Sequence, residues 1–134
     1  MKKKFQVISD LSNVQKTSQQ VLLFLKPLSL TEAVQFDIRL CLEEALINAM
    51  KYGNRLRKDL RVRLEMEYGD DEIRMTIEDQ GEGLDLKNLA DCTDKENLLR
   101  NHGRGVYLIH QLMDTVKYNS KGNCLIMSKA LQKT

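Results

Sequence analysis

The chain has 134 residues, 42% of them hydrophobic and 30% charged, and its formal net charge at pH 7 is +2. We expect one globular domain over residues 1–134 that makes no direct contact with nucleic acid, for which this net charge is too small. The longest apolar run, residues 21–25, excludes a transmembrane helix, and three widely spaced cysteines with only two histidines exclude a disulfide framework or zinc site.

The N-terminal segment predicts a strand and a helix. Its start, MKKKFQVISD, is basic but lacks the apolar core and cleavage site of a signal peptide, so we expect a cytoplasmic protein without membrane contact. Phe5 and Val7 alternate with polar residues, which indicates a short strand. From residue 12 to residue 26 apolar residues recur at helical spacing, and Pro27 ends this helix.

A second helix is predicted from about residue 30 to residue 52. Ser29 and Glu32 have the spacing of a capping box, and Gly53 with Asn54 ends the helix. On a helical wheel one apolar arc is formed by Val34, Ile38, Cys41, Leu42, Ala45, Leu46 and Ala49. This arc predicts the face of the helix that packs on the core.

A polar stripe runs along the edge of that arc. Glu44 and Asn48 lie together at i and i+4, in one stripe with Asp37 and Lys51, whereas Glu43 is expected to point into water. A carboxylate and an amide at this spacing suit a Mg²⁺ and phosphate site, with the amide oxygen as ligand and the carboxylate as proton acceptor. Taken alone, the pattern is explained as well by a hydrogen-bonded pair on the helix flank.

Two strands are predicted over residues 60–68 and 73–78, joined by the turn GDD. Basic residues gather before and along the first of them: Lys51, Arg55, Arg57, Lys58, Arg61 and Arg63. Because no aromatic residues are interleaved with them, we interpret this cluster as a solvated strand edge and not as an RNA-binding patch. The second strand ends in Asp79, followed by Gly81 and Gly83, which by itself is the ordinary composition of a turn.

The last third of the chain predicts a long polar segment, a helix and two short strands. Residues 84–102 are polar and irregular, a length that is typical of functional loops. Gly103-Arg104-Gly105 precedes a helix, where free backbone N–H groups form the usual anion site. Strands around Val116 and Leu125 complete a two-layer α+β sandwich with a mixed, mainly antiparallel sheet that helices cover on one face.

The order and spacing of three motifs resemble the N, G1 and G2 boxes of the GHKL ATPase superfamily, which has this Bergerat-type fold. They are Glu44-x-x-x-Asn48 on a helix, Asp79-x-Gly81-x-Gly83 after a strand and Gly103-x-Gly105 opening a helix. Within the superfamily, EEALINAMKYGN, IEDQGEGLD and GRGVYLIHQLMDTV are similar to the small anti-sigma-factor serine/threonine kinases of bacterial stress response and sporulation. The resemblance covers nearly the whole chain.

The resemblance implies a role for each motif residue. Asp79 accepts a hydrogen bond from the adenine amino group of ATP, Asn48 ligates Mg²⁺, and Glu44 is the general base. Gly81 and Gly83 let the backbone approach the nucleotide, while residues 84–102 form a lid over it. The phosphates are bound by backbone donors of Gly103 and Gly105, with Arg104 as a charge partner. One departure is Cys124, which stands where the family usually has Thr or Ser near the adenine; this weaker donor lowers affinity unless Asn123 compensates.

The resemblance also implies an ATP- and Mg²⁺-dependent kinase that sequesters a sigma factor and phosphorylates a small STAS-type antagonist, as a homodimer. Which surface binds these partners does not follow residue by residue. Two alternatives stay open: a partner-switching module that binds ATP without catalysis, and a detached histidine-kinase ATPase domain. The presence of Glu44 favours the active kinase, and the absence of a phosphoacceptor helix pair disfavours the histidine kinase, since His102 and His110 lie beside and within the last helix.

Overall fold

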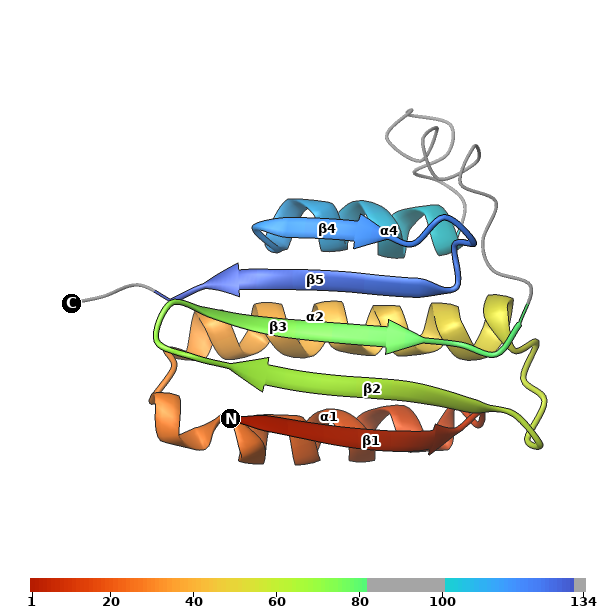
Figure 1. Ribbon diagram of the computed structural model, residues 1–134, viewed down its shortest axis with the longest axis horizontal. Coiled ribbons are helices and arrows are strands. Elements are labelled where there is room, and N and C mark those ends of the chain that lie inside the picture. Colours follow the sequence, from red (N-terminus) through yellow and green to blue (C-terminus); the bar gives the residue numbers. More distant parts are fainter. Residues whose placement is uncertain (82–100, 132–134) are drawn as a thin grey trace.

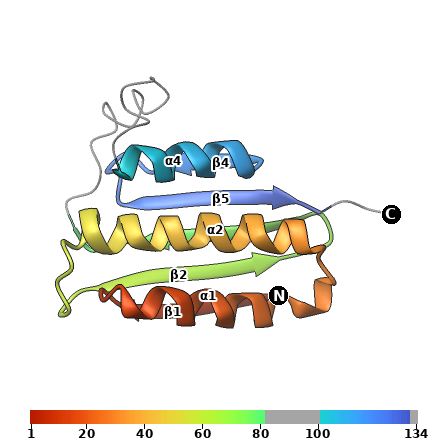
Figure 2. The same ribbon diagram turned by 180° about the vertical axis from the view of Figure 1, so that it is seen from behind.

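The computed structural model describes the backbone of residues 1–81 and 101–131 and the side-chain surroundings of 1–81 and 107–131. A five-stranded sheet forms one layer, in the order β1 (Lys2–Ile8), β2 (Arg61–Tyr68), β3 (Glu72–Glu78), β5 (Cys124–Ala130) and β4 (Thr115–Tyr118). Three helices form the other layer: α1 (Ser12–Phe24), α2 (Glu32–Asn48) and α4 (Asn101–Leu112). All three lie on the same face of the sheet (Figures 1 and 2), which confirms the predicted two-layer α+β sandwich.

The sheet is antiparallel and not mixed, which corrects the prediction. Every neighbouring pair among the described strands is antiparallel. Two helices separate β1 from β2, so the chain reverses direction three times and β2 returns antiparallel to β1. α4 makes β4 run parallel to β3, but the hairpin after β4 inserts β5 between them (Figure 1). No parallel pair therefore forms in the described sheet.

The core lies between the layers and follows the predicted periodicities. Ile73, Met75 and Ile77 of β3 are buried, while the residues between them are partly or fully exposed. On α2 the predicted apolar arc is buried from Ile38 to Ala49, with Val34 packed against it at the margin. Removal of these side chains from water is the main contribution to the stability of such a layer pair.

The start of α2 differs from the predicted capping box. The helix begins at Glu32, and its N-cap is Thr31, whose side-chain oxygen accepts a hydrogen bond from the Val34 amide at 3.2 Å. Ser29 cannot be the cap because the short 3-10 helix η1 (Lys26–Leu28) leaves it in the left-handed region, at φ 49° and ψ 49°. A cap residue needs the extended backbone that Thr31 has.

The end of α2 continues into a π-helical turn, η2 (Ala49–Gly53), and Asn54 follows as its C-cap. The helical segment therefore ends where Gly53 and Asn54 predict. The wider turn was not predicted from the sequence. Such turns inside or at the end of α-helices are frequent at functional sites, and this one lies directly behind the pocket described next.

Candidate functional site

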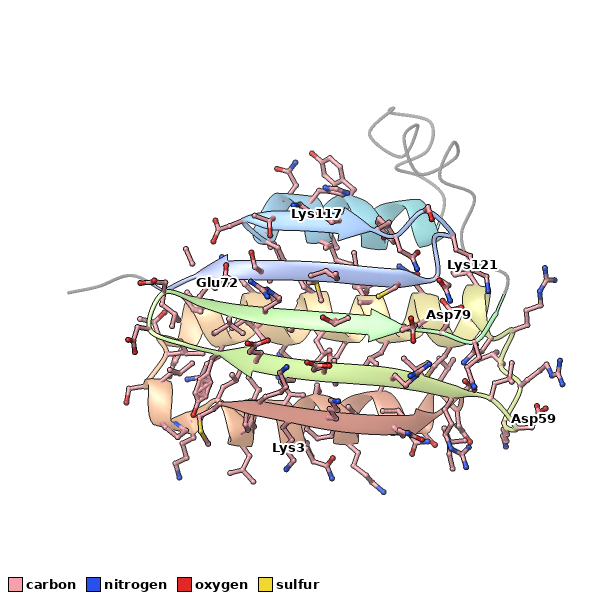
Figure 3. The ribbon with its side chains drawn as sticks, in the orientation of Figure 1. Lys3, Asp59, Glu72, Asp79, Lys117 and Lys121 are labelled. Carbon is pink, nitrogen blue, oxygen red and sulfur yellow. The ribbon has the colours of Figure 1, made fainter. Side chains whose placement is uncertain are left out.

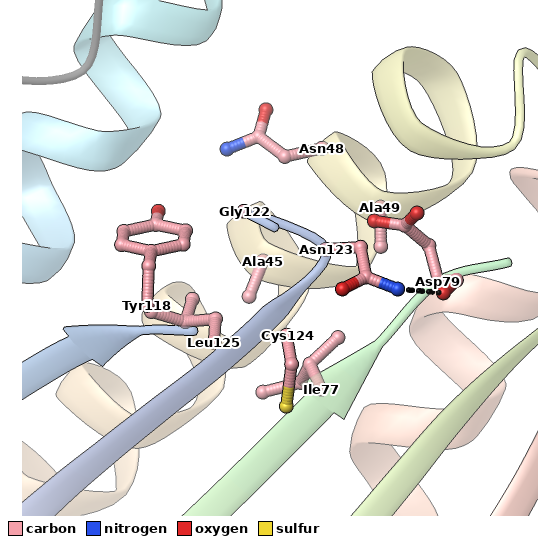
Figure 4. A pocket seen from close by; sticks show the side chains of 10 residues that line it. All are labelled: Ala45, Asn48, Ala49, Ile77, Asp79, Tyr118, Gly122, Asn123, Cys124 and Leu125. Atoms are coloured by element: carbon pink, nitrogen blue, oxygen red, sulfur yellow. Dashed lines mark hydrogen bonds between the residues drawn. The ribbon is translucent and has the colours of Figure 1, made fainter. Parts of the chain in front are cut away.

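A pocket opens at one end of the sandwich, between the C-terminal end of α2, the end of β3 and the turn that leads into β5 (Figure 4). Its lining residues are Ala45, Asn48, Ala49, Ile77, Asp79, Tyr118, Gly122, Asn123, Cys124 and Leu125. Two of the predicted site residues, Asn48 and Asp79, are thus brought to one cavity although 31 positions separate them in the sequence. Figure 3 shows Asp79 and Lys121 at this same end of the sheet.

Asp79 is a buried carboxylate on the pocket wall, with only 6% of its surface exposed. Burial raises its pKa, an effect that the Gly81 amide and the charge of Lys121 partly offset. The Gly81 amide donates to Asp79 Oδ1 at 2.9 Å, which leaves further lone pairs for a ligand. The backbone is held from the other side, because Asn123 Nδ2 donates to the Asp79 carbonyl at 3.0 Å and the Asp79 amide donates to the Asn123 carbonyl (Figure 4).

Two glycines pack against each other beside this carboxylate. A Cβ atom on Gly81 would lie 2.5 Å from the Gly53 carbonyl carbon and closer still to its oxygen. A Cβ on Gly53 would lie 2.7 Å from Asp79 Oδ1 and closer still to the rest of the carboxyl group. Sequence reasoning assigned Gly53 only the end of a helix, so its part in shaping the site was missed. The signal that could have found it is its place five positions after Asn48, at the end of the helix that carries the N box.

Asn48 presents a free amide to the pocket. It is 8% exposed, and no described residue hydrogen-bonds its side chain. The described part of the chain also has no fully buried side-chain nitrogen or oxygen without a partner. The Asn48 amide therefore reaches solvent through the pocket, into which Figure 4 shows it projecting. A buried amide left without a protein partner is a group that awaits a ligand or water.

Glu44 lies one turn before Asn48 on α2 and is partly buried. It does not line the pocket itself but occupies the same side of the helix. Burial, and to a lesser extent the neighbouring Glu43, raises the pKa of Glu44. No described residue forms an ion pair or hydrogen bond with its carboxylate, so Glu44 is free to accept a proton.

Glu43 does not point into water, which corrects the prediction. It is partly buried and accepts a hydrogen bond from Ser18 Oγ at 3.0 Å. Ser18 is buried on α1, so Glu43 links the two helices. The wheel placed Glu43 correctly outside the apolar arc, but it could not show that α1 covers that side. The two adjacent acids thus have separate surroundings: one joins helices, and the other has no described protein partner.

Farther along the same stripe, Asp37 forms an ion pair with Lys129 at 3.5 Å, and Lys129 also donates to the Leu112 carbonyl at the end of α4. Between this pair and Glu44 lies Cys41, whose pKa burial and nearby Asp37 raise to about 12. Its thiol is therefore not ionised at neutral pH. These contacts fix α2, α4 and β5 to one another and place no further polar group in the pocket.

The turn before β5 is organised by Asn119. Its side-chain oxygen accepts from the amides of Gly122, Asn123 and Cys124, and its Nδ2 donates to Asn123 Oδ1 at 2.8 Å. Gly122, at φ 81°, takes the left-handed conformation that this turn requires. Asn123 is thereby held against Asp79, while Cys124 lines the pocket at the first position of β5.

The remaining predicted site residues lie partly outside the described structure. Gly83 and nearly all of the predicted lid, residues 84–102, fall in the segment that is not described. The last two lid positions already belong to α4, which begins at Asn101. Gly103, Arg104 and Gly105 thus lie in the first turns of the helix and not before it. Only the first few amides of a helix have no intrahelical acceptor, so Gly103 still offers an anion donor, whereas the amide of Gly105, the fifth residue of α4, is placed to donate within the helix.

The residues present fit a magnesium ion held mainly by a nucleotide. No group of three acidic, histidine or cysteine side chains that could enclose a metal occurs in the described residues. Mg²⁺ does not need such a cage, because it keeps several waters and binds through one or two protein oxygens together with substrate phosphates. The amide of Asn48, which has no hydrogen-bond partner among the described residues, could supply one such oxygen.

Comparison with known proteins agrees with this geometry. The model of the family described as the histidine kinase-like ATPase domain matches residues 7–129. The chain is 34% identical to the serine-protein kinase RsbW of Staphylococcus epidermidis over 72% of this chain and 66% of that protein. It is 28% identical to RsbW of Listeria monocytogenes serovar 1/2a, over 73% and 66%, and 29% identical to RsbW of Oceanobacillus iheyensis, over 68% and 61%. The matched part spans slightly less than two thirds of these relatives. Among the described helices, none has the length and apolarity needed to cross a bilayer.

Proposed function

The chain belongs to the histidine kinase-like ATPase domain family, and from that premise we propose that it is an ATP-dependent protein serine/threonine kinase acting as an anti-sigma factor. The observation that supports the proposal is one pocket that joins the buried Asp79 carboxylate to the Asn48 amide, which has no partner within the described part of the chain. Glu44, free of protein partners in the described structure, lies on the same side of α2.

In this proposal Asp79 selects the base. A carboxylate accepts a hydrogen bond from the exocyclic amino group of adenine. The Gly81 amide occupies only part of its accepting capacity, and the buried position makes each further hydrogen bond stronger than it is in water. The nucleotide would continue past Asn48 toward the first turns of α4, with Gly81 and Gly83 allowing close approach. The free backbone amide of Gly103 and the charge of Arg104 would bind its phosphates, and Gly105, which has no side chain, would let them approach the helix closely.

Glu44 would act as the general base. A base that works near neutral pH benefits from a pKa above that of a free carboxylate, and burial raises the pKa of Glu44 in that direction. It would accept the proton of a substrate hydroxyl as that oxygen attacks the terminal phosphate. Bound magnesium, held by Asn48 and the phosphates, would neutralise charge on the phosphates. The reaction transfers one phosphoryl group and leaves ADP.

The proposed partners are a sigma factor, which the protein would sequester in one state, and a small STAS-type antagonist, which it would phosphorylate in the other. A homodimer in the cytoplasm is part of the same proposal. The support is the similarity to relatives named serine-protein kinases. His110 is exposed on α4, which by itself gives the histidine-kinase alternative no support.

Phosphotransfer from γ-labelled ATP and Mg²⁺ into an extract of the source organism tests the proposal. The parent protein should label a small protein on Ser or Thr, and Glu44→Ala should abolish this label while keeping ATP binding. Glu43→Ala is the matched control, because it removes the adjacent acid, whose carboxylate accepts a hydrogen bond from Ser18 of α1. Equal labelling with Glu44→Ala would contradict the assignment of the base. ATP binding without any label would instead support regulation by sequestration alone.

A further inference from the structure

Asn54 is an almost fully enclosed polar side chain near the pocket, with 1% of its surface exposed. It follows the π-helical turn directly, and its backbone amide donates to the Ala49 carbonyl at 2.8 Å. Its side chain does not enter the pocket. All its polar atoms bind protein groups, as is normal for a buried polar side chain, so its role near the pocket depends on which groups it holds.

The side chain of Asn54 joins three segments that end at this corner of the fold. Nδ2 donates to Ser9 Oγ at 2.7 Å and to the Arg61 carbonyl at 3.0 Å, which ties together the end of β1 and the start of β2. Oδ1 accepts from the Gln80 amide at 2.8 Å. Gln80 is the residue between Asp79 and Gly81, so this last bond holds the turn that presents the carboxylate.

The Gln80 turn has a second attachment on the same side. The side-chain oxygen of Gln80 accepts from the Arg61 amide at 2.6 Å, and Gly81 packs on the Gly53 carbonyl. Gly53 and Asn54 directly continue the helix that bears Asn48. The segment from residue 49 to residue 54 therefore connects the helix that bears the Asn48 amide to the turn that presents the Asp79 carboxylate.

We propose that Asn54 is a positioning residue that sets the place of the Asp79 carboxylate and thereby the preference of the pocket for adenine over guanine. The inference rests on the proposed nucleotide-binding function. Adenine presents an amino donor at the position where guanine presents a carbonyl acceptor. A carboxylate fixed at that position accepts a hydrogen bond from the adenine amino group and repels the guanine carbonyl. A carboxylate that is free to shift loses this discrimination between the two bases.

Calorimetry tests the proposal by measuring the binding of ATP and of GTP to the parent protein and to the variants Asn54→Ala and Ser9→Ala. Ser9→Ala is the matched control, since it removes a partner of Asn54 at the same corner but leaves the Gln80 bond intact. The ratio of ATP to GTP affinity should fall about tenfold in Asn54→Ala, the factor that one hydrogen bond to a charged group contributes. Ser9→Ala should keep the parent ratio even if its melting temperature falls.

Backbone hydrogen exchange of the Gln80 amide gives a readout that needs no nucleotide. Its protection should be lost in Asn54→Ala and kept in Ser9→Ala. If the alanine protein does not fold, Asn54→Ser repeats both measurements, because its hydroxyl is shorter than the Asn amide and ends short of the Gln80 amide. An unchanged ratio, or unchanged Gln80 protection, in a folded Asn54 variant would overturn the inference alone. A parent protein that binds neither nucleotide would overturn the proposed function and the inference together.

Discussion

The contact between Gly53 and Gly81 makes a sharp prediction about two substitutions by alanine. Neither glycine has a positive φ angle, so the requirement is one of space alone. In Gly81→Ala the new methyl group meets the backbone carbonyl of Gly53. In Gly53→Ala it meets the side chain of Asp79. A backbone carbonyl at the end of a helix cannot rotate away, whereas a carboxyl group can.

The two variants should therefore differ in kind. Overpacking of a well-packed site costs about 1–3 kcal/mol, and occasionally more. The clash in Gly81→Ala can be relieved only by a shift of the backbone, so this variant should lose about 3 kcal/mol or more of unfolding free energy. For a domain of this size, that loss lowers the melting temperature by about 10 °C or more. Gly53→Ala should lose less stability, because Asp79 can turn aside, but should bind ATP at least about tenfold more weakly since the acceptor is displaced.

Urea denaturation and ATP calorimetry on the same preparations distinguish these effects. Gly69→Ala is the control: Gly69 is exposed in the β2–β3 turn, and an added Cβ meets nothing within 4 Å. That variant should match the parent protein or gain up to about 1 kcal/mol by restricting the unfolded chain. The reasoning is refuted if Gly81→Ala unfolds at the same denaturant concentration as Gly69→Ala, because the close approach of the two backbones would then be absent.

Two further predictions concern the polar side chains of the pocket. Burial raises the pKa of Asp79 above its ordinary 3.8, so the folded state binds the proton more tightly than the unfolded state, and stability falls as pH rises from 3.8 through the raised pKa. Asp79→Asn should abolish this fall in pH-dependent denaturation and should strongly weaken ATP binding in calorimetry. Unchanged ATP affinity would refute the role of Asp79. Asn48→Ala should remove the Mg²⁺ dependence of ATP binding with little change in stability, since no described protein group loses a hydrogen bond; magnesium titrations identical to those of the parent would contradict its role as a ligand.

Much of the fold could be predicted because the spacing of apolar residues along a strand or helix shows which of its side chains are buried. The alternation in β3 and the apolar arc on α2 each identified the buried residues. The errors arose where a residue's surroundings come from a distant segment. Glu43 lies outside the arc of its own helix, yet Ser18 of another helix covers it. Ser29 has the right spacing for a cap, yet the turn at Pro27 fixes its backbone in a conformation that a cap cannot have.

The sequence predicted the side chains that face the pocket but not the residues that hold them in position. Asp79 and Asn48 belong to motifs whose spacing is recognisable. Asn54 was read only as a helix end, because nothing in a single sequence shows that its amide reaches Ser9 and Gln80, 45 and 26 positions away. Side chains that bind ligands follow local patterns, whereas side chains that hold other residues in place depend on which segments the fold brings together.

The alternation of direction along the chain explains why the separate motifs meet at one end of the molecule. Among the described helices and strands, each runs opposite to the one before it, so the end of α2, the end of β3, the start of α4 and the start of β5 all lie at the same end of the sandwich (Figure 1). Asn48, Asp79, the glycines of α4 and Cys124 each occupy one of these ends. An extra strand or helix between any two of them would reverse the direction and place the later motif at the opposite end. Their order in the sequence therefore has functional meaning only together with the number of elements between them.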